Sequence, residues 1–479
     1  MTIPNSWHGD WSNFNVAVLG LGKSGFSVAD TLMELGAKVT VFAKTSNPSF
    51  EDLLSVIGAE FVKGDTASHI KDSNQKFDFA VVSPGFPPSH EIVQYLVGAE
   101  IPILTDIDLA FRLRDKTPKV ADWITITGTN GKTSTSELVE HILRVANLRA
   151  VACGNIGTPI LDVIREPDGY DFLVVELSSF QLHYAGEIRA EVSAFLNLAP
   201  DHIDWHGDIE SYLADKSKIF HSTKTAIIFN EQDSKTFEAA RAAEVIDGCR
   251  AVSFSLFTPQ RSSIGYVEEF LVDRAFLEER ADQALEIASV ADIAEIGVVS
   301  KHLMANVAAA TAITRAIGIA PNIIREAIRT FRLSPHRIEV VLISDGVTFV
   351  DDSKATNAHA AAASLEAFDS IVWIAGGLLK GVDPTDLIIQ NRDKLRAVIV
   401  IGAETQTLGE LLSQHAPNVP VFIVEDSSVM ATAVAKAREF AQAGDTVLLA
   451  PAAASMDQFR DYADRGNAFA SEVRKQLNQ

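Results

Sequence analysis

The stretch Thr127-Gly128-Thr129-Asn130-Gly131-Lys132-Thr133-Ser134 decides the expected fold of this 479-residue chain. It follows a β-branched run at residues 123–127 and precedes an amphipathic helical pattern at residues 137–145. A strand, a glycine loop, Lys-Thr and a helix are what a phosphate-binding loop requires, because glycines let backbone N–H groups face the phosphates. Lys132 would then neutralise phosphate oxygens, and the Thr133 hydroxyl would reach Mg²⁺. The glycines are closer together than in the usual spacing, so an ordinary strand-to-helix turn is the alternative.

Short Val/Ile-rich runs alternate with helical patterns in three successive segments of the chain. This alternation is typical of parallel α/β sheets, and the chain is too long for one core. We therefore expect an α/β fold with three domains: a Rossmann-like N-terminal domain, a P-loop-type central ATPase domain and a Rossmann-like C-terminal domain. An antiparallel β excursion is expected in the central domain at residues 245–297, with strands at 252–256 and 266–272. Polar, proline-containing segments predict domains at residues 1–117, 118–332 and 333–479.

The net charge of -22 argues against a nucleic-acid or anionic-membrane partner, since either would need a basic patch. The two cysteines, Cys153 and Cys249, are too few for a disulfide framework and are expected to be reduced. The N-terminus lacks the pattern of a signal peptide, and no apolar run reaches the length of about 20 residues that spans a membrane. We therefore expect a cytoplasmic protein. If it binds an anionic ligand, the basic side chains that contact this ligand must be gathered at the binding site.

A second glycine motif, Gly20-Leu21-Gly22-Lys23-Ser24-Gly25, follows the first expected strand. It resembles a shortened dinucleotide fingerprint, but Ala43 and Lys44 stand where an acidic residue would end the next strand. An NAD site is therefore doubtful, and the pyrophosphate of another nucleotide is possible. Ser83 and Gly85 could line the same edge, or form a plain turn.

Glu176 ends a buried strand one unit after the phosphate loop, where a Mg²⁺ ligand belongs, although a surface glutamate is the alternative. Further on, His202, Asp204 and His206 are two residues apart, so an extended segment would place all three on one face. Zinc, a Mg²⁺ contact and a simple turn all remain open there. Local sequence alone gives no role to Lys216 or its neighbour Lys218.

Three polar loops follow strands in the last segment, at residues 351–357, 376–381 and 450–459. They meet at one predicted sheet edge, which is where ligands sit in doubly wound sheets. Arg337, Lys354 and Lys380 are the local cations that an acidic protein would need there, although each alone is more often a surface charge.

Together these motifs resemble the Mur ligase family over nearly the whole chain. The resemblance rests on residues 128–133, the block Asp201-His202-Ile203-Asp204-Trp205-His206, His336-Arg337 and residues 352–357. Residues 176–182 and 454–459 are similar to the family branch that adds D-glutamate. The resemblance implies ATP-dependent, ADP-forming ligation of D-glutamate to UDP-N-acetylmuramoyl-L-alanine through an acyl phosphate, in peptidoglycan precursor synthesis. A sister amide ligase, including folylpolyglutamate synthase-like enzymes, and a nucleotide-binding regulator without turnover are the rival interpretations.

The resemblance also implies roles for matching positions. The expected ATP-binding residues are Gly128, Thr129, Asn130, Gly131, Lys132, Thr133, Ser134, Asn306, Arg337 and Asp352. The expected contacts to the UDP substrate are Gly20, Leu21, Lys23, Ser24, Gly25, Ser83, Gly85, Asn155, Ser178 and Gln181. The expected D-glutamate pocket is Lys354, Thr356, Lys380, Ser455 and Tyr462. Lys132, Glu176, His202 and Lys216 are expected to be catalytic, and the expected Mg²⁺ ligands are Thr133, Glu176, His202 and Lys216, with Lys216 carbamylated.

Three positions depart from the family pattern. Leu303 stands where the family often has asparagine, Tyr462 often corresponds to phenylalanine, and Ala43-Lys44 replaces the acidic residue of the second strand. The contacts to adenine and uracil are the ones that these departures affect. The expected oligomeric state is a monomer.

Overall fold

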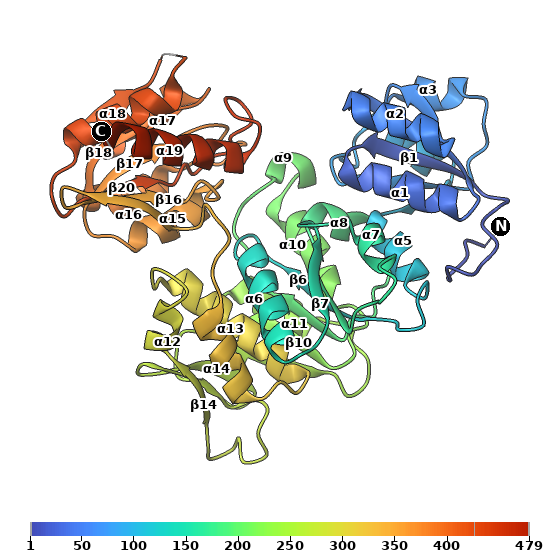
Figure 1. Cartoon of the computed structure of the whole chain (residues 1–479), viewed down its shortest axis with the longest axis horizontal. Helices are drawn as coiled ribbons and strands as arrows, with labels where there is room; N and C mark the ends of the chain where they lie inside the picture. Colours follow the sequence, from blue (N-terminus) through green and yellow to red (C-terminus); the bar gives the residue numbers. More distant parts are fainter. Residues whose placement is uncertain (1, 426, 478–479) are drawn as a thin grey trace.

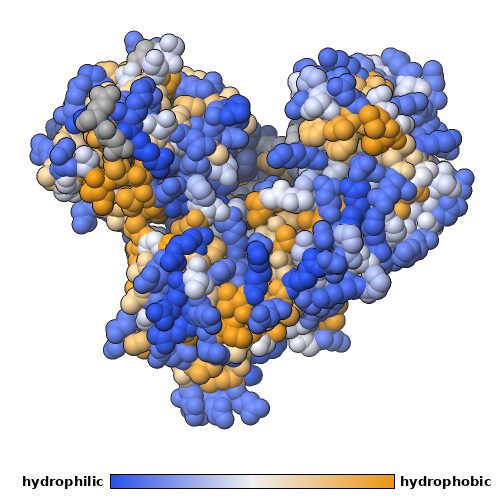
Figure 2. Space-filling view, viewed as in Figure 1, coloured by the Kyte–Doolittle hydropathy of each residue, from blue (hydrophilic) through white to orange (hydrophobic). Residues whose placement is uncertain are grey.

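The computed structural model describes residues 2–425 and 427–477, which form three lobes (Figure 1). The N-terminal and C-terminal lobes lie on opposite sides of the upper end of the central lobe in this view. The space-filling view shows a hollow between those two lobes, above the central one (Figure 2). Within the described ranges, none of the helices has the length and apolar character needed to cross a membrane.

The N-terminal lobe is a five-stranded parallel sheet in the order β3-β2-β1-β4-β5. Val16 and Val18 of β1 face one core and Ala17 and Leu19 face another, as expected for a strand covered on both faces. The strand order reverses between β1 and β4, and a ligand crevice is expected beyond the strand ends there. The elements are β1 (Asn15–Leu21), α1 (Lys23–Glu34), β2 (Lys38–Ser46), α2 (Pro48–Ile57), β3 (Glu60–Lys63), α3 (Ala67–Asp72), β4 (Phe79–Val82), α4 (Glu91–Gly98), β5 (Ile103–Leu104) and α5 (Asp106–Leu113).

The central lobe is built on a nine-stranded sheet in the order β14-β13-β12-β11-β10-β9-β6-β8-β7. Its strands are β6 (Asp122–Thr127), β7 (Ala150–Gly154), β8 (Phe172–Glu176), β9 (Val192–Phe195), β10 (Ala226–Asn230), β11 (Arg250–Phe254), β12 (Ser263–Val267), β13 (Phe270–Asp273) and β14 (Leu285–Ser289). Its helices are α6 (Lys132–Val145), α7 (Ile160–Ile164), α8 (Ser179–Tyr184), α9 (Ile203–His206), α10 (Ile209–Ser217), η1 (Lys218–Phe220), α11 (Ser234–Arg241), α12 (Val290–Ala294), α13 (Lys301–Ala316) and α14 (Pro321–Thr330).

The β excursion differs in detail from the sequence prediction. β11 and β12 continue the parallel sheet, and β13 pairs antiparallel with both β12 and β14. The prediction of a single strand at residues 266–272 is wrong, because the chain reverses direction inside this segment and forms the β12–β13 hairpin. Glu268 lies at the turn with a φ of 52°, a left-handed conformation that ends the extended run.

The C-terminal lobe is a six-stranded sheet in the order β15-β16-β20-β17-β18-β19. Its strands pair in parallel except for the edge hairpin of β15 and β16. Trp373 of β17 is fully buried, and its Nε1 donates to the Ala450 carbonyl at 2.7 Å. The elements are β15 (Glu339–Ser344), β16 (Val347–Asp351), α15 (Ala358–Glu366), β17 (Ile371–Ala375), α16 (Thr385–Asn391), η2 (Arg392–Lys394), β18 (Leu395–Val400), α17 (Thr405–His415), β19 (Val421–Ile423), α18 (Val429–Phe440), β20 (Thr446–Leu449) and α19 (Tyr462–Leu477).

Both cysteines are free thiols. Cys153 is buried in β7, and burial raises the pKa of its thiol. Cys249 is partly buried just before β11.

Candidate active site

The phosphate loop joins β6 to α6, with Lys132 as the first helical residue. Gly131 has a φ of 80°, and a Cβ atom there would lie 2.3 Å from Oδ1 of Asn306, so any other residue would be strained and would displace the Asn306 side chain. The Lys132 ammonium folds back over the loop and donates to the carbonyls of Gly128 at 2.8 Å and Thr129 at 2.9 Å. Burial lowers the pKa of Lys132. The loop therefore holds a desolvated cation beside backbone N–H groups, an arrangement suited to phosphate oxygens.

Lys216 reaches the same loop from α10. Its Nζ donates to the Gly128 carbonyl at 2.9 Å and to the Thr127 hydroxyl at 3.3 Å, and the residue is only 1% exposed. Burial, together with the nearby charge of Lys132, places the pKa of Lys216 well below its usual value. Two lysine side chains thus share one backbone carbonyl.

Glu176 lies at the end of β8, which pairs with β6 and β7. Its Oε1 accepts a hydrogen bond from Nδ2 of Asn155 at 2.8 Å. Its Oε2 is buried and finds no hydrogen-bond partner in the described part of the chain. A buried, unpaired carboxylate oxygen in a cavity that Thr133 also lines fits a hard divalent cation, since such ions prefer oxygen ligands.

His202 begins α9 in a left-handed conformation, with a φ of 54°. Burial and the charges of nearby lysines lower the pKa of His202 to about 4, against the opposing effect of Asp201. The expectation that His202, Asp204 and His206 share one face is wrong, because the segment coils into a helical turn. Asp204 is exposed, while His206 points to Asp215 and Ser179.

The phosphate loop faces the C-terminal lobe across a cavity of about 380 Å³. The sequence-predicted residues that line it are Thr129, Asn130, Gly131, Lys132, Thr133, Ser134, Asn155, Glu176, His202, Asn306, Arg337, Asp352, Lys354, Thr356 and Lys380. The cavity is therefore lined by side chains of both the central and the C-terminal lobes, which residues 331–338 connect.

Acidic and basic groups of the C-terminal lobe are strongly desolvated at this cavity. Asp352 accepts hydrogen bonds from the Ile338 backbone N–H at 3.2 Å and from the Ser364 hydroxyl, yet burial raises its pKa to about 6. Burial and the neighbouring Arg337 lower the pKa of Lys354 to about 8. The Lys354 ammonium lies 3.8 Å from the centroid of the Tyr462 ring. Ser455 is buried nearby in the 450–459 loop but does not line the cavity.

Two residues that the sequence reasoning left without a role connect the lobes. Asn357 donates to Asp201 at 3.1 Å and to Oδ1 of Asn130 at 3.2 Å. Asp201 also lies 3.6 Å from the Lys380 ammonium. Asp201 directly precedes His202 in the sequence motif, so the motif could have pointed to Asp201 as a functional residue. No sequence pattern indicated that it would contact the C-terminal lobe.

Of the residues expected at the UDP substrate, Asn155 lines this cavity and those of the N-terminal lobe lie apart from it. Ser24, Gly25, Ser83 and the unforeseen Asp106 line a small separate cavity at the carboxyl edge of the N-terminal sheet. A Cβ atom on Gly20 would lie 2.7 Å from the Ser83 hydroxyl, so the two loops touch. Leu21 is buried, whereas Lys23 and Gly85 are exposed.

Helix α8 lies next to this N-terminal cavity. Ser178 and Gln181 form its capping box, in which each side chain bonds to the other residue's backbone N–H. Nε2 of Gln181 approaches Asp106 at 3.4 Å, and burial raises the pKa of Asp106 to about 6. Gln181 therefore connects α8 to the N-terminal cavity through Asp106.

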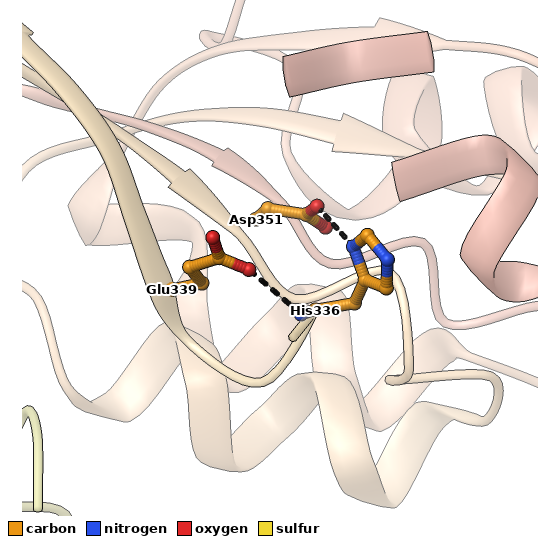
Figure 3. A group of neighbouring side chains, drawn as sticks. All are labelled: His336, Glu339 and Asp351. Atoms are coloured by element: carbon orange, nitrogen blue, oxygen red, sulfur yellow. Dashed lines mark hydrogen bonds and ion pairs between the residues drawn. The ribbon is translucent and has the colours of Figure 1, made fainter. Parts of the chain in front are cut away.

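A separate cluster anchors the connection to the C-terminal lobe (Figure 3). Nδ1 of His336 lies 2.6 Å from Asp351, and Glu339 accepts the His336 backbone N–H at 3.0 Å. These groups could surround a metal ion, but they already satisfy one another. The cluster fixes the backbone next to Arg337, in a segment where His336 and Ile338 both have positive φ values.

The comparisons with known proteins agree with this architecture. Residues 14–105 match the Mur ligase MurD-like N-terminal domain, residues 126–314 the Mur ligase middle domain, and residues 336–453 the Mur ligase glutamate ligase domain. Two relatives are named UDP-N-acetylmuramoylalanine--D-glutamate ligase. The one from Leifsonia xyli subsp. xyli is 46% identical, covering 98% of this chain and 94% of its own. The one from Streptomyces avermitilis is also 46% identical, covering 97% and 99%.

Solved structures show the same fold at low sequence identity. A pseudomurein peptide ligase type C from Methanothermus fervidus has a TM-score of 0.58 at 16% identity, covering 97% of this chain and 100% of its own. UDP-N-acetylmuramate-alanine ligase from Thermotoga maritima has a TM-score of 0.58 at 15% identity, with the same coverage. From its three matched domains and its full-length relatives, the chain belongs to the Mur ligase family.

Proposed function

We propose that the chain is an ADP-forming ligase that joins D-glutamate to UDP-N-acetylmuramoyl-L-alanine in peptidoglycan precursor synthesis. The observation that carries the proposal is the cavity in which Lys132 of the phosphate loop faces Lys354 and Lys380 of the C-terminal lobe. One side suits a nucleotide triphosphate, and the other suits an amino acid with two carboxylates. The names of the full-length relatives supply the substrates. A monomer that works in the cytoplasm is part of the proposal.

The chemistry follows from the poor reactivity of a carboxylate. ATP transfers its γ-phosphoryl group to the carboxylate of the muramoyl-alanine substrate, which releases ADP and leaves an acyl phosphate. The amine of D-glutamate attacks the acyl carbon, the tetrahedral intermediate loses phosphate, and an amide bond remains. The protein contributes positioning and charge stabilisation rather than covalent bonds. Lys132 would stabilise the phosphate oxygens as two anions come together.

The four expected metal ligands can be tested against the geometry. Glu176 presents its unpaired Oε2, Thr133 lines the same cavity, and His202 is held neutral by burial. Lys216 becomes an oxygen ligand only as a carbamate, which its buried, weakly basic amine favours. These residues fit Mg²⁺, which when bound would supply positive charge against the phosphate oxygens.

The remaining roles divide among the three lobes. Residues 118–332 would bind ATP, with Asn306 beside the loop and with Arg337 and Asp352 reaching in from the C-terminal side. Residues 333–479 would hold D-glutamate through Lys354, Thr356, Lys380, Ser455 and Tyr462. Residues 1–117 would bind the UDP group along Gly20, Leu21, Lys23, Ser24, Gly25, Ser83 and Gly85, while Asn155, Ser178 and Gln181 face the muramoyl part.

A panel of amino acids tests the proposal directly. The purified chain is given ATP, magnesium and UDP-N-acetylmuramoyl-L-alanine, and phosphate release is measured with D-glutamate, L-glutamate, L-alanine or L-lysine. Release with D-glutamate alone is expected. A parallel reaction with a reduced folate and L-glutamate covers the folylpolyglutamate rival. Phosphate release that depends on another amino acid, or none with D-glutamate, would reject the proposal.

A further inference from the structure

A second cluster of titratable side chains lies beside the active site, centred on Asp215 of α10. Oδ2 of Asp215 lies 2.8 Å from Nδ1 of His183 and 3.0 Å from Nδ1 of His206. Its Oδ1 accepts a hydrogen bond from the Lys218 ammonium at 2.9 Å. The Asp215 side chain is 9% exposed and the His206 side chain is fully buried. Despite the burial, these three partners together place the pKa of Asp215 below its usual value.

The contacts determine which ring nitrogens carry protons. A carboxylate only accepts hydrogen bonds, so Nδ1 of both histidines must be the donor. Nε2 of His206 forms a hydrogen bond of 2.9 Å with the Ser179 hydroxyl, which can donate or accept. The result is a continuous chain of hydrogen bonds from Ser179 through His206 and Asp215 to His183. Charge-assisted bonds of this kind are stronger than neutral ones.

This chain of bonds joins three segments that carry functional candidates. His183 and Ser179 belong to α8, the helix that also carries Gln181. His206 ends α9, which His202 begins. Asp215 precedes Lys216 on α10, and successive helical residues point in different directions, so Asp215 does not compete for the Lys216 site.

Helix α8 also reaches the N-terminal lobe. The Tyr184 hydroxyl donates to the carbonyl of Phe86 at 3.0 Å, in the loop that follows β4. The Lys218 ammonium adds a bond to the His183 carbonyl at 2.7 Å, which ties the end of α8 to α10 a second time. A displacement of α10 relative to α8 would therefore break several charged contacts at once.

We propose that Asp215 is a positioning residue of the ligase reaction, which holds Gln181, His202 and Lys216 in register through His183 and His206. The inference rests on the proposed function. It predicts that loss of the carboxylate affects the UDP-substrate side and the rate of phosphoryl transfer together. The expected D-glutamate residues belong to the C-terminal lobe, where Lys380 approaches Asp201, just before His202, at 3.6 Å; α8 and α10 carry none of the expected D-glutamate residues. Replacing partners that orient active-site ligands typically costs 10–100-fold, and we expect a loss of that size in kcat/KM for the UDP substrate.

The test compares Asp215→Asn with Glu210→Gln, an exposed carboxylate on the same helix. Both histidines bond to Oδ2 of Asp215 and Lys218 bonds to Oδ1, so an asparagine either keeps both histidines on a neutral carbonyl oxygen while its amide opposes the Lys218 ammonium, or turns its amide against both Nδ1–H groups. In Asp215→Asn, the KM for UDP-N-acetylmuramoyl-L-alanine should rise and kcat should fall, while the KM for D-glutamate stays within about twofold. Glu210→Gln should match the wild type. Unchanged kinetics with a lower melting temperature would show a purely structural role and overturn the proposal.

Two further readouts do not require turnover. Nuclear magnetic resonance of histidine-labelled full-length protein should show two downfield imidazole Nδ1–H protons in the wild type, and both downfield signals should be lost in Asp215→Asn, because a neutral amide replaces the charged acceptor. Calorimetry without ATP or magnesium should show weaker binding of UDP-N-acetylmuramoyl-L-alanine to the variant. Retention of both protons, or of wild-type binding, would refute the inference. A wild type that shows the protons and binds the UDP substrate but forms no amide with D-glutamate would instead refute the proposed function.

Discussion

Replacing Asp352 with asparagine should make the protein more stable and less active at the same time. Asp352 is 8% exposed, and burial raises its pKa to about 6 from an unfolded value near 3.8. This rise corresponds to about 3 kcal/mol of unfavourable free energy when the carboxylate is ionised in the folded state. The native state holds the proton more tightly than the unfolded state does. Stability is therefore lost as pH rises from about 3.8 to about 6, and the loss persists at higher pH.

Asparagine has a similar shape and does not ionise. At pH 8, Asp352→Asn should gain up to about 3 kcal/mol in the free energy of unfolding, whereas at pH 4 the gain should nearly vanish. On the proposed role of Asp352 in nucleotide binding, the variant also loses a charged acceptor for ATP, and hydrogen bonds to charged groups contribute about 1.5–3 kcal/mol. The KM for ATP should therefore rise about 10–100-fold. In the wild type, the same KM should rise as pH falls below about 6.

Urea denaturation at pH 4 and pH 8, together with ATP titrations of phosphate release, measures both effects. Asp345→Asn is the matched control, because this exposed carboxylate belongs to the same lobe. An Asp352→Asn variant that is no more stable than the wild type at pH 8 would refute the argument from burial. An unchanged KM for ATP would refute the assigned contact with the nucleotide.

Other substitutions probe the phosphate loop and the C-terminal core. Lys132→Ala should reduce kcat for phosphate release by orders of magnitude while the far-ultraviolet circular dichroism stays unchanged; appreciable activity would contradict the phosphate role. Gly131→Ala should raise the KM for ATP, because its Cβ would collide with Oδ1 of Asn306 at 2.3 Å; wild-type ATP titrations would argue against this close contact. Trp373→Ala should cost about 3–5 kcal/mol in urea denaturation, since the ring is fully buried, and a loss under 1 kcal/mol would contradict its core position.

Local sequence patterns were enough for the elements that carry the phosphate site. The β-branched run before Gly128 is typical of a buried strand, and the amphipathic run after Lys132 has the period of a helix. These two patterns therefore predict β6 and α6. The polar loops after buried strands also lie at the sheet edge where they were expected. These features depend on neighbours within a few residues.

Features that depend on distant contacts could not be predicted in this way. The hairpin turn at Glu268 and Glu269 has no glycine or proline to mark it, although these two glutamates interrupt the apolar residues on either side. The helical turn that separates His206 from His202 is one of the alternatives that the local sequence left open, because the spacing of two residues fits an extended segment as well. The bonds of Asn357 to Asp201 and Asn130 join residues 156 and 227 positions apart, and only the folded arrangement of the lobes brings them together.

The placement of the two thiols makes the chain convenient for spectroscopy of lobe movement. Cys153 lies inside β7, out of reach of maleimide or methanethiosulfonate reagents, so Cys249 is the one partly accessible native thiol in the described ranges. Replacing Cys249 with serine would leave almost no native thiol that reacts with the label. Nitroxide labels on new cysteines at Val56 of α2 and Ser413 of α17, both exposed, would then report the separation of the outer lobes as each substrate is added.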